Sequence, residues 1–111
     1  MNAEQEYEAG AAAFRAGDAA TGAKHLRNAA FAGHAEAQNQ LARIYFAQLK
    51  DRSDLADLEA AAQGGDHVAL FVLAMSFIDG KLIEKDTEKA MAALRLSAAQ
   101  GNIMARNMLG A

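Results

Sequence analysis

The sequence predicts an all-α fold, a short right-handed α-solenoid built from antiparallel helix hairpins. A pattern of Gly-x3-Ala-x3-Leu-x3-aromatic starts at Gly33, at Gly65 and at Gly101, and the chain ends before the third aromatic position. The copies start 32 and 36 residues apart, a period typical of stacked helix pairs. Alanine is abundant, proline is absent, and no segment shows the sustained alternation of a half-buried strand.

Seven helices are expected from the residues that end and cap helices along the chain. Glycine is followed by Asp or Asn at three junctions, Gly17-Asp18, Gly65-Asp66 and Gly101-Asn102. Glycine ends a helix in the left-handed conformation, and the next side chain caps the following helix. Such short junctions make neighbouring helices antiparallel. The expected helices cover about 3–16, 19–32, 34–47, 53–63, 66–78, 87–100 and 103–109.

The chain is expected to be one domain, 1–111, of about three helix pairs and a closing helix. The first pair is a degenerate copy, because Phe14 precedes a glycine by three residues, as Phe77 does. The repeats of this domain cover roughly 3–32, 33–64, 65–100 and, in part, 101–111.

The repeat pattern also predicts a core, because residues four apart share one stripe of a helix. Small Ala37, Ala69 and Ala105 should let helices approach closely. The closing helix lacks its aromatic residue, so it should expose part of its apolar face, including Met104 or Met108, unless another subunit covers it. The residues expected to be nearly fully buried are Leu41, Tyr45, Leu73 and Phe77.

Composition argues against several classes of function. The net charge is -3 and the basic residues are scattered, so nucleic acid is not an expected partner. The longest apolar run, 68–75, is too short to span a bilayer, and no membrane partner is expected. The first residues lack the features of a signal peptide, which favours the cytoplasm. A periplasmic or exported protein is the alternative if a signal peptide has been removed.

No catalytic or metal-binding motif stands out, so no cofactor is expected and the chain is interpreted as a non-enzyme. His25, His34 and His67 have no second ligand at a convincing metal spacing. His34 and His67 follow repeat glycines and are expected to be exposed at helix starts. The three serines lie in no nucleophile motif.

Several fixed-spacing elements together resemble the Sel-one-like repeat family, which is related to tetratricopeptide repeats. The best match runs from Ala61-Ala62-Gln63-Gly64-Gly65 through Gly80-Lys81-Leu82-Ile83-Glu84-Lys85-Asp86 to Ser97-Ala98-Ala99-Gln100-Gly101. The resemblance covers roughly 29–111, with Ala42 and Ala74 replacing a usual glycine. It implies a solenoid of helix pairs whose first helices line a concave binding face, and a bacterial-style adaptor or regulatory scaffold.

The helix expected at 66–78 is apolar nearly all round, which indicates either a buried helix or one that covers an interface. Both interpretations remain open. For the second, Phe71 and Met75 would form the centre of a binding surface with a polar rim. The candidate residues on the concave face are Asn39, Arg43, Phe46, Val68, Phe71, Met75, Ile78, Met104 and Asn107.

The expected function is therefore the binding of another protein or peptide, with self-association as a possible mode. One alternative is an immunity protein that neutralises a secreted toxin by tight 1:1 binding, since proteins with these repeats also occur in that role. A second alternative is the binding or hydrolysis of penicillin-type ligands, described for some members of the family. No nucleophile in this sequence supports the second alternative.

Overall fold

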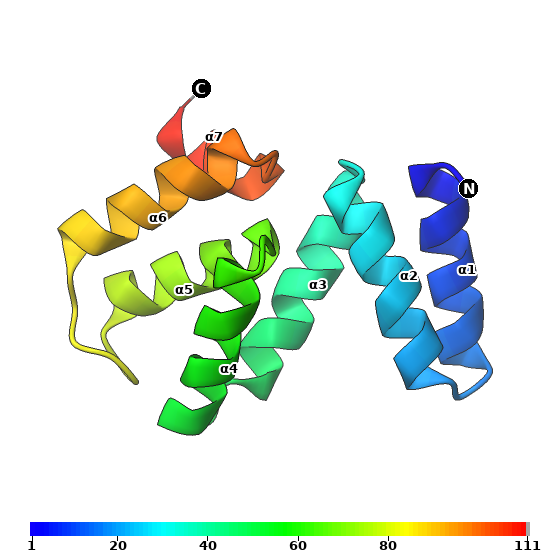
Figure 1. Ribbon diagram of the computed structural model, residues 1–111, viewed down its shortest axis with the longest axis horizontal. Coiled ribbons are helices and arrows are strands. Elements are labelled where there is room, and N and C mark those ends of the chain that lie inside the picture. The colour runs from blue at the N-terminus through cyan, green and yellow to red at the C-terminus, as the bar shows by residue number, and fades with distance from the viewer. Residues whose placement is uncertain (111) are drawn as a thin grey trace. The chain divides into compact units, whose positions relative to one another are not determined.

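A computed structural model describes residues 1–110, which form seven α-helices and no strand (Figure 1). All seven expected helices are confirmed, and each observed end lies within one residue of its expected position. The all-α prediction is therefore correct. The helices are α1 (Ala3–Arg15), α2 (Ala19–Phe31), α3 (Ala35–Gln48), α4 (Arg52–Gln63), α5 (His67–Asp79), α6 (Thr87–Ala99) and α7 (Ile103–Leu109).

The expected helix junctions are confirmed by their hydrogen bonds. Gly65 and Gly101 have φ angles of 102° and 104°, a region that side chains rarely enter. Asp66 then accepts hydrogen bonds from the first amides of α5, and Asn102 accepts one from the amide of Ala105 in α7. These side chains satisfy amides that have no partner inside their own helix, so each helix start is determined locally.

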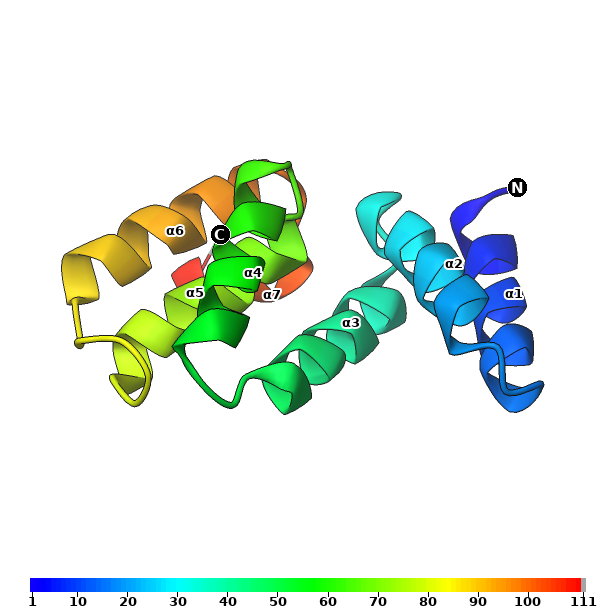
Figure 2. The same cartoon turned by 60° about the horizontal axis from the view of Figure 1, so that its bottom comes forward.

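The described residues cluster into two compact units, Met1–Leu41 and the segment from Ala42 onward, and the boundary falls inside α3. In the N-terminal unit, α1 and α2 lie side by side (Figures 1 and 2). The two helices approach closely at two glycines: a Cβ atom on Gly10 would lie 3.1 Å from the carbonyl oxygen of Gly22 and 3.3 Å from the amide of Leu26. Backbone therefore packs directly on backbone at this crossing.

We expect Gly10→Ala to destabilise the protein by about 1–2 kcal/mol, because overpacking forces the two helices apart. A loss of stability would be informative, because alanine inside an ordinary helix is favoured over glycine by about 0.5–1 kcal/mol. Ala12→Gly, at an exposed position of the same helix, is the control and should show that ordinary preference. A higher midpoint for Gly10→Ala in urea would contradict the close crossing.

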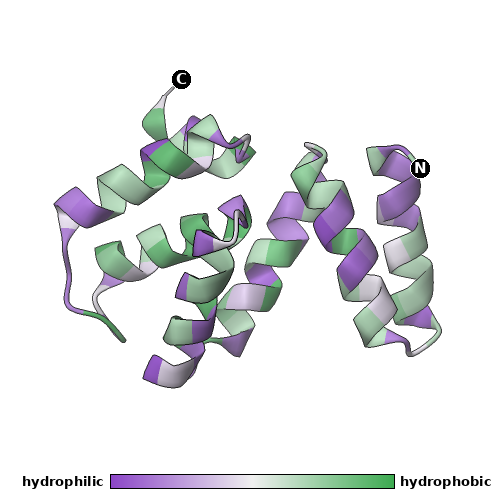
Figure 3. Cartoon of the chain, in the orientation of Figure 1, coloured by the Kyte–Doolittle hydropathy of each residue, from purple (hydrophilic) through white to green (hydrophobic). Residues whose placement is uncertain are grey.

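In the C-terminal unit, α5 packs against both α4 and α6, and α7 packs against α6. Figures 1 and 2 show α5 and α6 side by side, connected by the loop 80–86. Hydrophobic residues extend along most of α5 (Figure 3), as expected for a helix with neighbours on two sides. The most buried side chains of α5 include Val68, Ala69, Val72 and Ala74.

The predicted core is confirmed at Leu41, which is 1% exposed, but it is wrong at Tyr45, Leu73 and Phe77, which are half-buried. In α5 the best buried stripe runs through Val68 and Val72, one residue before the predicted stripe. One residue turns a helix by about 100°, so the predicted aromatic stripe lies at the edge of the core. The small alanines at 37, 69 and 105 are fully buried, as expected.

A hydrogen bond that the repeat pattern did not reveal recurs in two repeats. The side chain five residues after the repeat glycine donates to the carbonyl three residues before it. Gln38 Nε2 donates to the oxygen of Ala30 at 3.0 Å, and Arg106 Nε donates to the oxygen of Ala98 at 3.1 Å. Both carbonyls lie in the last turn of a helix and also accept from the amide of the repeat glycine, so the side chain adds a second hydrogen bond at the helix end. The middle repeat has Leu70 at this position and cannot form the bond.

The closing helix exposes apolar surface as predicted. Met108 is 52% exposed, whereas Met104 is half-buried.

Candidate functional site

Two of the predicted binding residues belong to the core. Val68 is fully buried and Phe71 is only 7% exposed. The prediction that Phe71 is the accessible centre of a binding surface is therefore corrected. The physical reason is that α4 and α6 cover α5, so its excess of apolar residues is used in packing.

The other predicted residues are accessible to different degrees. Phe46 is 44% exposed, and Ile78, Arg43 and Asn107 are also exposed. Three more, Asn39, Met75 and Met104, are half-buried. Asn39 belongs to the N-terminal unit, whereas the other residues of the predicted set belong to the C-terminal unit.

Phe46 lines a shallow depression of about 330 Å³, which we name the Phe46 depression. It lies where the end of α3, the end of α5 and the following loop meet. Asp79 and Lys81 contribute charges of opposite sign, and the amide of Lys81 donates to Asp79 Oδ1 at 2.8 Å. The lining residues are Phe46, Leu49, Ser76, Asp79, Lys81 and Leu82.

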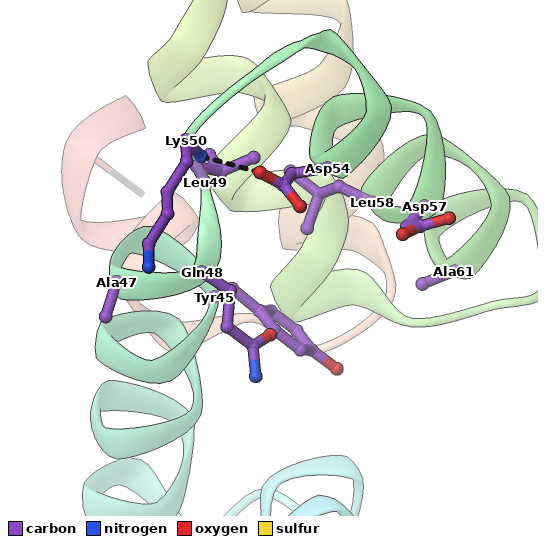
Figure 4. Close-up of a pocket in the computed structure, with 9 residues that line it drawn as sticks. All are labelled: Tyr45, Ala47, Gln48, Leu49, Lys50, Asp54, Asp57, Leu58 and Ala61. Atoms are coloured by element: carbon purple, nitrogen blue, oxygen red, sulfur yellow. Dashed lines mark hydrogen bonds between the residues drawn. The ribbon is translucent and has the colours of Figure 1, made fainter.

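A second depression, of about 440 Å³, lies between the end of α3 and α4 and shares Leu49 with the first (Figure 4). We name it the Tyr45 depression. The Tyr45 hydroxyl donates to Asp66, the cap of α5, which holds the aromatic ring in place. Its lining residues are Tyr45, Ala47, Gln48, Leu49, Lys50, Asp54, Asp57, Leu58 and Ala61.

The Tyr45 depression has an acidic wall formed by α4. Asp54 Oδ2 accepts from the amides of Lys50 and Asp51 at 2.8 and 3.0 Å, whereas Asp57 is exposed. Figure 4 shows the Lys50 side chain directed toward Ala47, away from both carboxylates. Its charge therefore does not neutralise the wall by direct contact.

Sequence reasoning found Phe46 but missed its neighbours Leu49 and Leu82 and the acidic wall. The available signal was the connection after Gln48, which is shorter than the loop between α5 and α6. That connection brings Leu49 and Lys50 directly against the start of α4.

The histidines of the N-terminal unit have structural partners in α1. His25 Nδ1 donates to Glu6 Oε2 at 2.6 Å, and this hydrogen bond lowers the pKa of Glu6. His34 Nε2 lies 2.8 Å from Glu4 Oε2, while its Nδ1 accepts from the amide of Ala37. The His34 ring also stacks on Tyr7, with ring centroids 4.4 Å apart. Both histidines therefore connect helices, and His34 also caps α3.

His67 is not the exposed residue that the sequence suggested, since it is 4% exposed. Burial lowers its pKa, and the charge of Asp66 opposes that effect. Its carbonyl accepts from the hydroxyl of Ser97 at 2.7 Å, and its Nδ1 contacts the side-chain amide of Asn102. These contacts connect three helices of the C-terminal unit.

Within residues 1–110, no cluster of three or more His, Asp or Glu side chains is arranged to hold a metal ion. Nor does that part of the chain contain a helix of the length and apolarity needed to cross a bilayer. The Phe46 and Tyr45 depressions are two adjoining concave surfaces that can receive part of another molecule. No protein-family model matches the chain, and no match was found among curated proteins or solved structures.

Proposed function

We propose that this protein is a protein-binding helical-repeat module that holds a peptide segment of its partner on the two adjoining depressions. The observation that carries the proposal is the exposure of Phe46, which lines the Phe46 depression. Leu49 lines both this depression and the Tyr45 depression. A large aromatic side chain presented beside a concave surface is the usual anchor of a protein interface. The resemblance to Sel-one-like repeats supports the same role, that of an adaptor or regulatory scaffold.

The lining of the depressions indicates the chemistry of the segment. Phe46, Leu49 and Leu82 favour an apolar side chain in the Phe46 depression. Asp54 and Asp57 favour a lysine or arginine in the Tyr45 depression, where the ring of Tyr45 offers a further attractive contact to a cation. The partner segment is thus an apolar residue followed or preceded closely by a basic one.

Selection from a random peptide library displayed on phage tests the proposal directly. We expect enriched peptides that combine a basic and an apolar residue. Phe46→Ala should weaken the binding of such a peptide at least about tenfold, which is about 1.4 kcal/mol. Leu96→Ala is the matched control, because Leu96 is exposed on α6 but lines neither depression.

The acidic wall is tested separately by Asp57→Asn. This change should weaken the binding of basic peptides and reduce the dependence of their affinity on salt concentration, because one charge pair is lost. Peptides that bind equally well to Phe46→Ala and to the wild type would contradict the proposed surface. Enriched peptides without basic residues would contradict only the role of the wall.

A further inference from the structure

We propose that the contact between His67 and Asn102 is a pH-sensitive latch that holds α7 in place, closed at neutral pH and weakened in mild acid. The inference is independent of the binding surface, whose depressions contain neither residue. His67 is the first residue of α5 and Asn102 is the cap of α7. They are separated by 35 positions in the sequence, and both are buried.

The hydrogen bonds around Asn102 determine which way its amide faces. Its Oδ1 accepts from the amide of Ala105 at 2.9 Å, so its Nδ2 is directed to His67 Nδ1, 3.3 Å away. Because Nδ2 only donates, Nδ1 of His67 must be an unprotonated acceptor. The imidazole is therefore neutral in the latched state.

Ser97 completes the arrangement at the end of α6. Its hydroxyl donates to the carbonyl of His67 at 2.7 Å, and its own carbonyl accepts from the amide of Asn102 at 3.0 Å. The starts of α5 and α7 and the end of α6 thus form one closed ring of hydrogen bonds. A change at His67 is transmitted directly to the cap of α7.

Protonation of Nδ1 would place an N–H group against the N–H groups of Asn102. Rotation of the Asn102 amide could present its oxygen to His67, but the amide of Ala105 would then lose its acceptor. Either response removes one hydrogen bond of the buried ring, the bond between His67 and Asn102 or the bond between Asn102 and the amide of Ala105. The helix α7 has only seven residues, too few to be stable without its cap and its packing.

Burial of the His67 ring sets the direction of the effect. Burial lowers its pKa, and Asp66 is the charged group that opposes this. Tyr45 of α3 donates to Asp66, and Arg106 of α7 donates to the carbonyl of Ala98.

The pH at which α7 is released follows from how strongly His67 binds a proton in the latched state and in the released state. Above the usual histidine pKa of about 6.5, His67 is neutral whether α7 is latched or released, and the latch has its full strength. Below that value the released state takes up a proton that the latched state resists. The equilibrium therefore shifts toward release by up to tenfold per pH unit, until the pH reaches the lowered pKa.

Hydrogen exchange measured by NMR on the full chain tests this inference at the amides of Ala105 and Arg106. Their protection, relative to an unfolded amide at the same pH, should fall by up to about tenfold per unit below pH 6.5. His67→Gln retains an uncharged acceptor and should show constant protection. An equal loss of protection throughout α5 and α6 would overturn the latch, because it would report global unfolding.

Asn102→Asp provides a test in the opposite direction. A carboxylate at this position still caps α7 and would form an ion pair with protonated His67. We expect the pKa of His67, followed by its ring proton signals, to rise above its usual value. Protection of α7 should then be highest in mild acid and decrease as the pH rises. A wild-type His67 that titrates normally, or a variant without this reversal, would overturn the inference.

Discussion

A Phe71→Glu variant is expected to lose the cooperative folding of the C-terminal unit. Phe71 is almost inaccessible in α5, and α4 and α6 pack on that helix. Removing a buried phenylalanine costs about 3–5 kcal/mol, and burying an unpaired carboxylate costs several more. The sum is comparable to the whole stability of a small domain, about 5–15 kcal/mol. Circular dichroism and the dispersion of methyl NMR signals measure the loss.

Phe46→Glu is the matched control, because it introduces the same charge at an exposed phenylalanine. This variant should stay folded, with a change in the free energy of unfolding of about 0.5 kcal/mol or less. It should nevertheless fail to bind the peptides selected by the wild type. If Phe71→Glu were as stable as Phe46→Glu, Phe71 would not be a core residue.

The second large effect is expected for Leu94→Ala. Leu94 lies on the buried face of α6 and is 2% exposed. Truncation of a leucine at such a site removes buried apolar surface and leaves a cavity, which typically costs about 2–5 kcal/mol. In a urea titration the midpoint of unfolding should be lower than that of the wild type, while the free energy of unfolding should fall with urea concentration at an unchanged slope.

Leu73→Ala distinguishes the observed core from the one suggested by the repeat pattern. Leu73 is half-buried, so its truncation should cost about 1 kcal/mol, clearly less than that of Leu94. Equal losses for the two variants would place Leu73 in the core and contradict the observed orientation of α5.

Helix positions could be predicted from the sequence because their ends depend on nearby residues. The pairs Gly65-Asp66 and Gly101-Asn102 contain both the left-handed glycine and the capping side chain, and both behave as expected. None of these features requires contacts between distant segments.

The faces of the helices were harder to predict, and α5 shows why. Its apolar residues surround the helix, so no polar side indicates which stripe faces solvent. The partners α4 and α6 determine that Val68, Val72 and Phe71 are buried while Ile78 is exposed. The same limitation applies to His67, whose burial depends on Asn102, a residue 35 positions away.

The candidate site combines both kinds of information. Phe46 could be identified from its place in the repeat, but its depression is completed by Leu82, and the acidic wall by Asp57. By itself the sequence determined the helices and their caps, because these depend on interactions within about one helical turn. Only the tertiary structure decided which side chains are buried and which form a surface, because burial depends on residues far apart in the sequence.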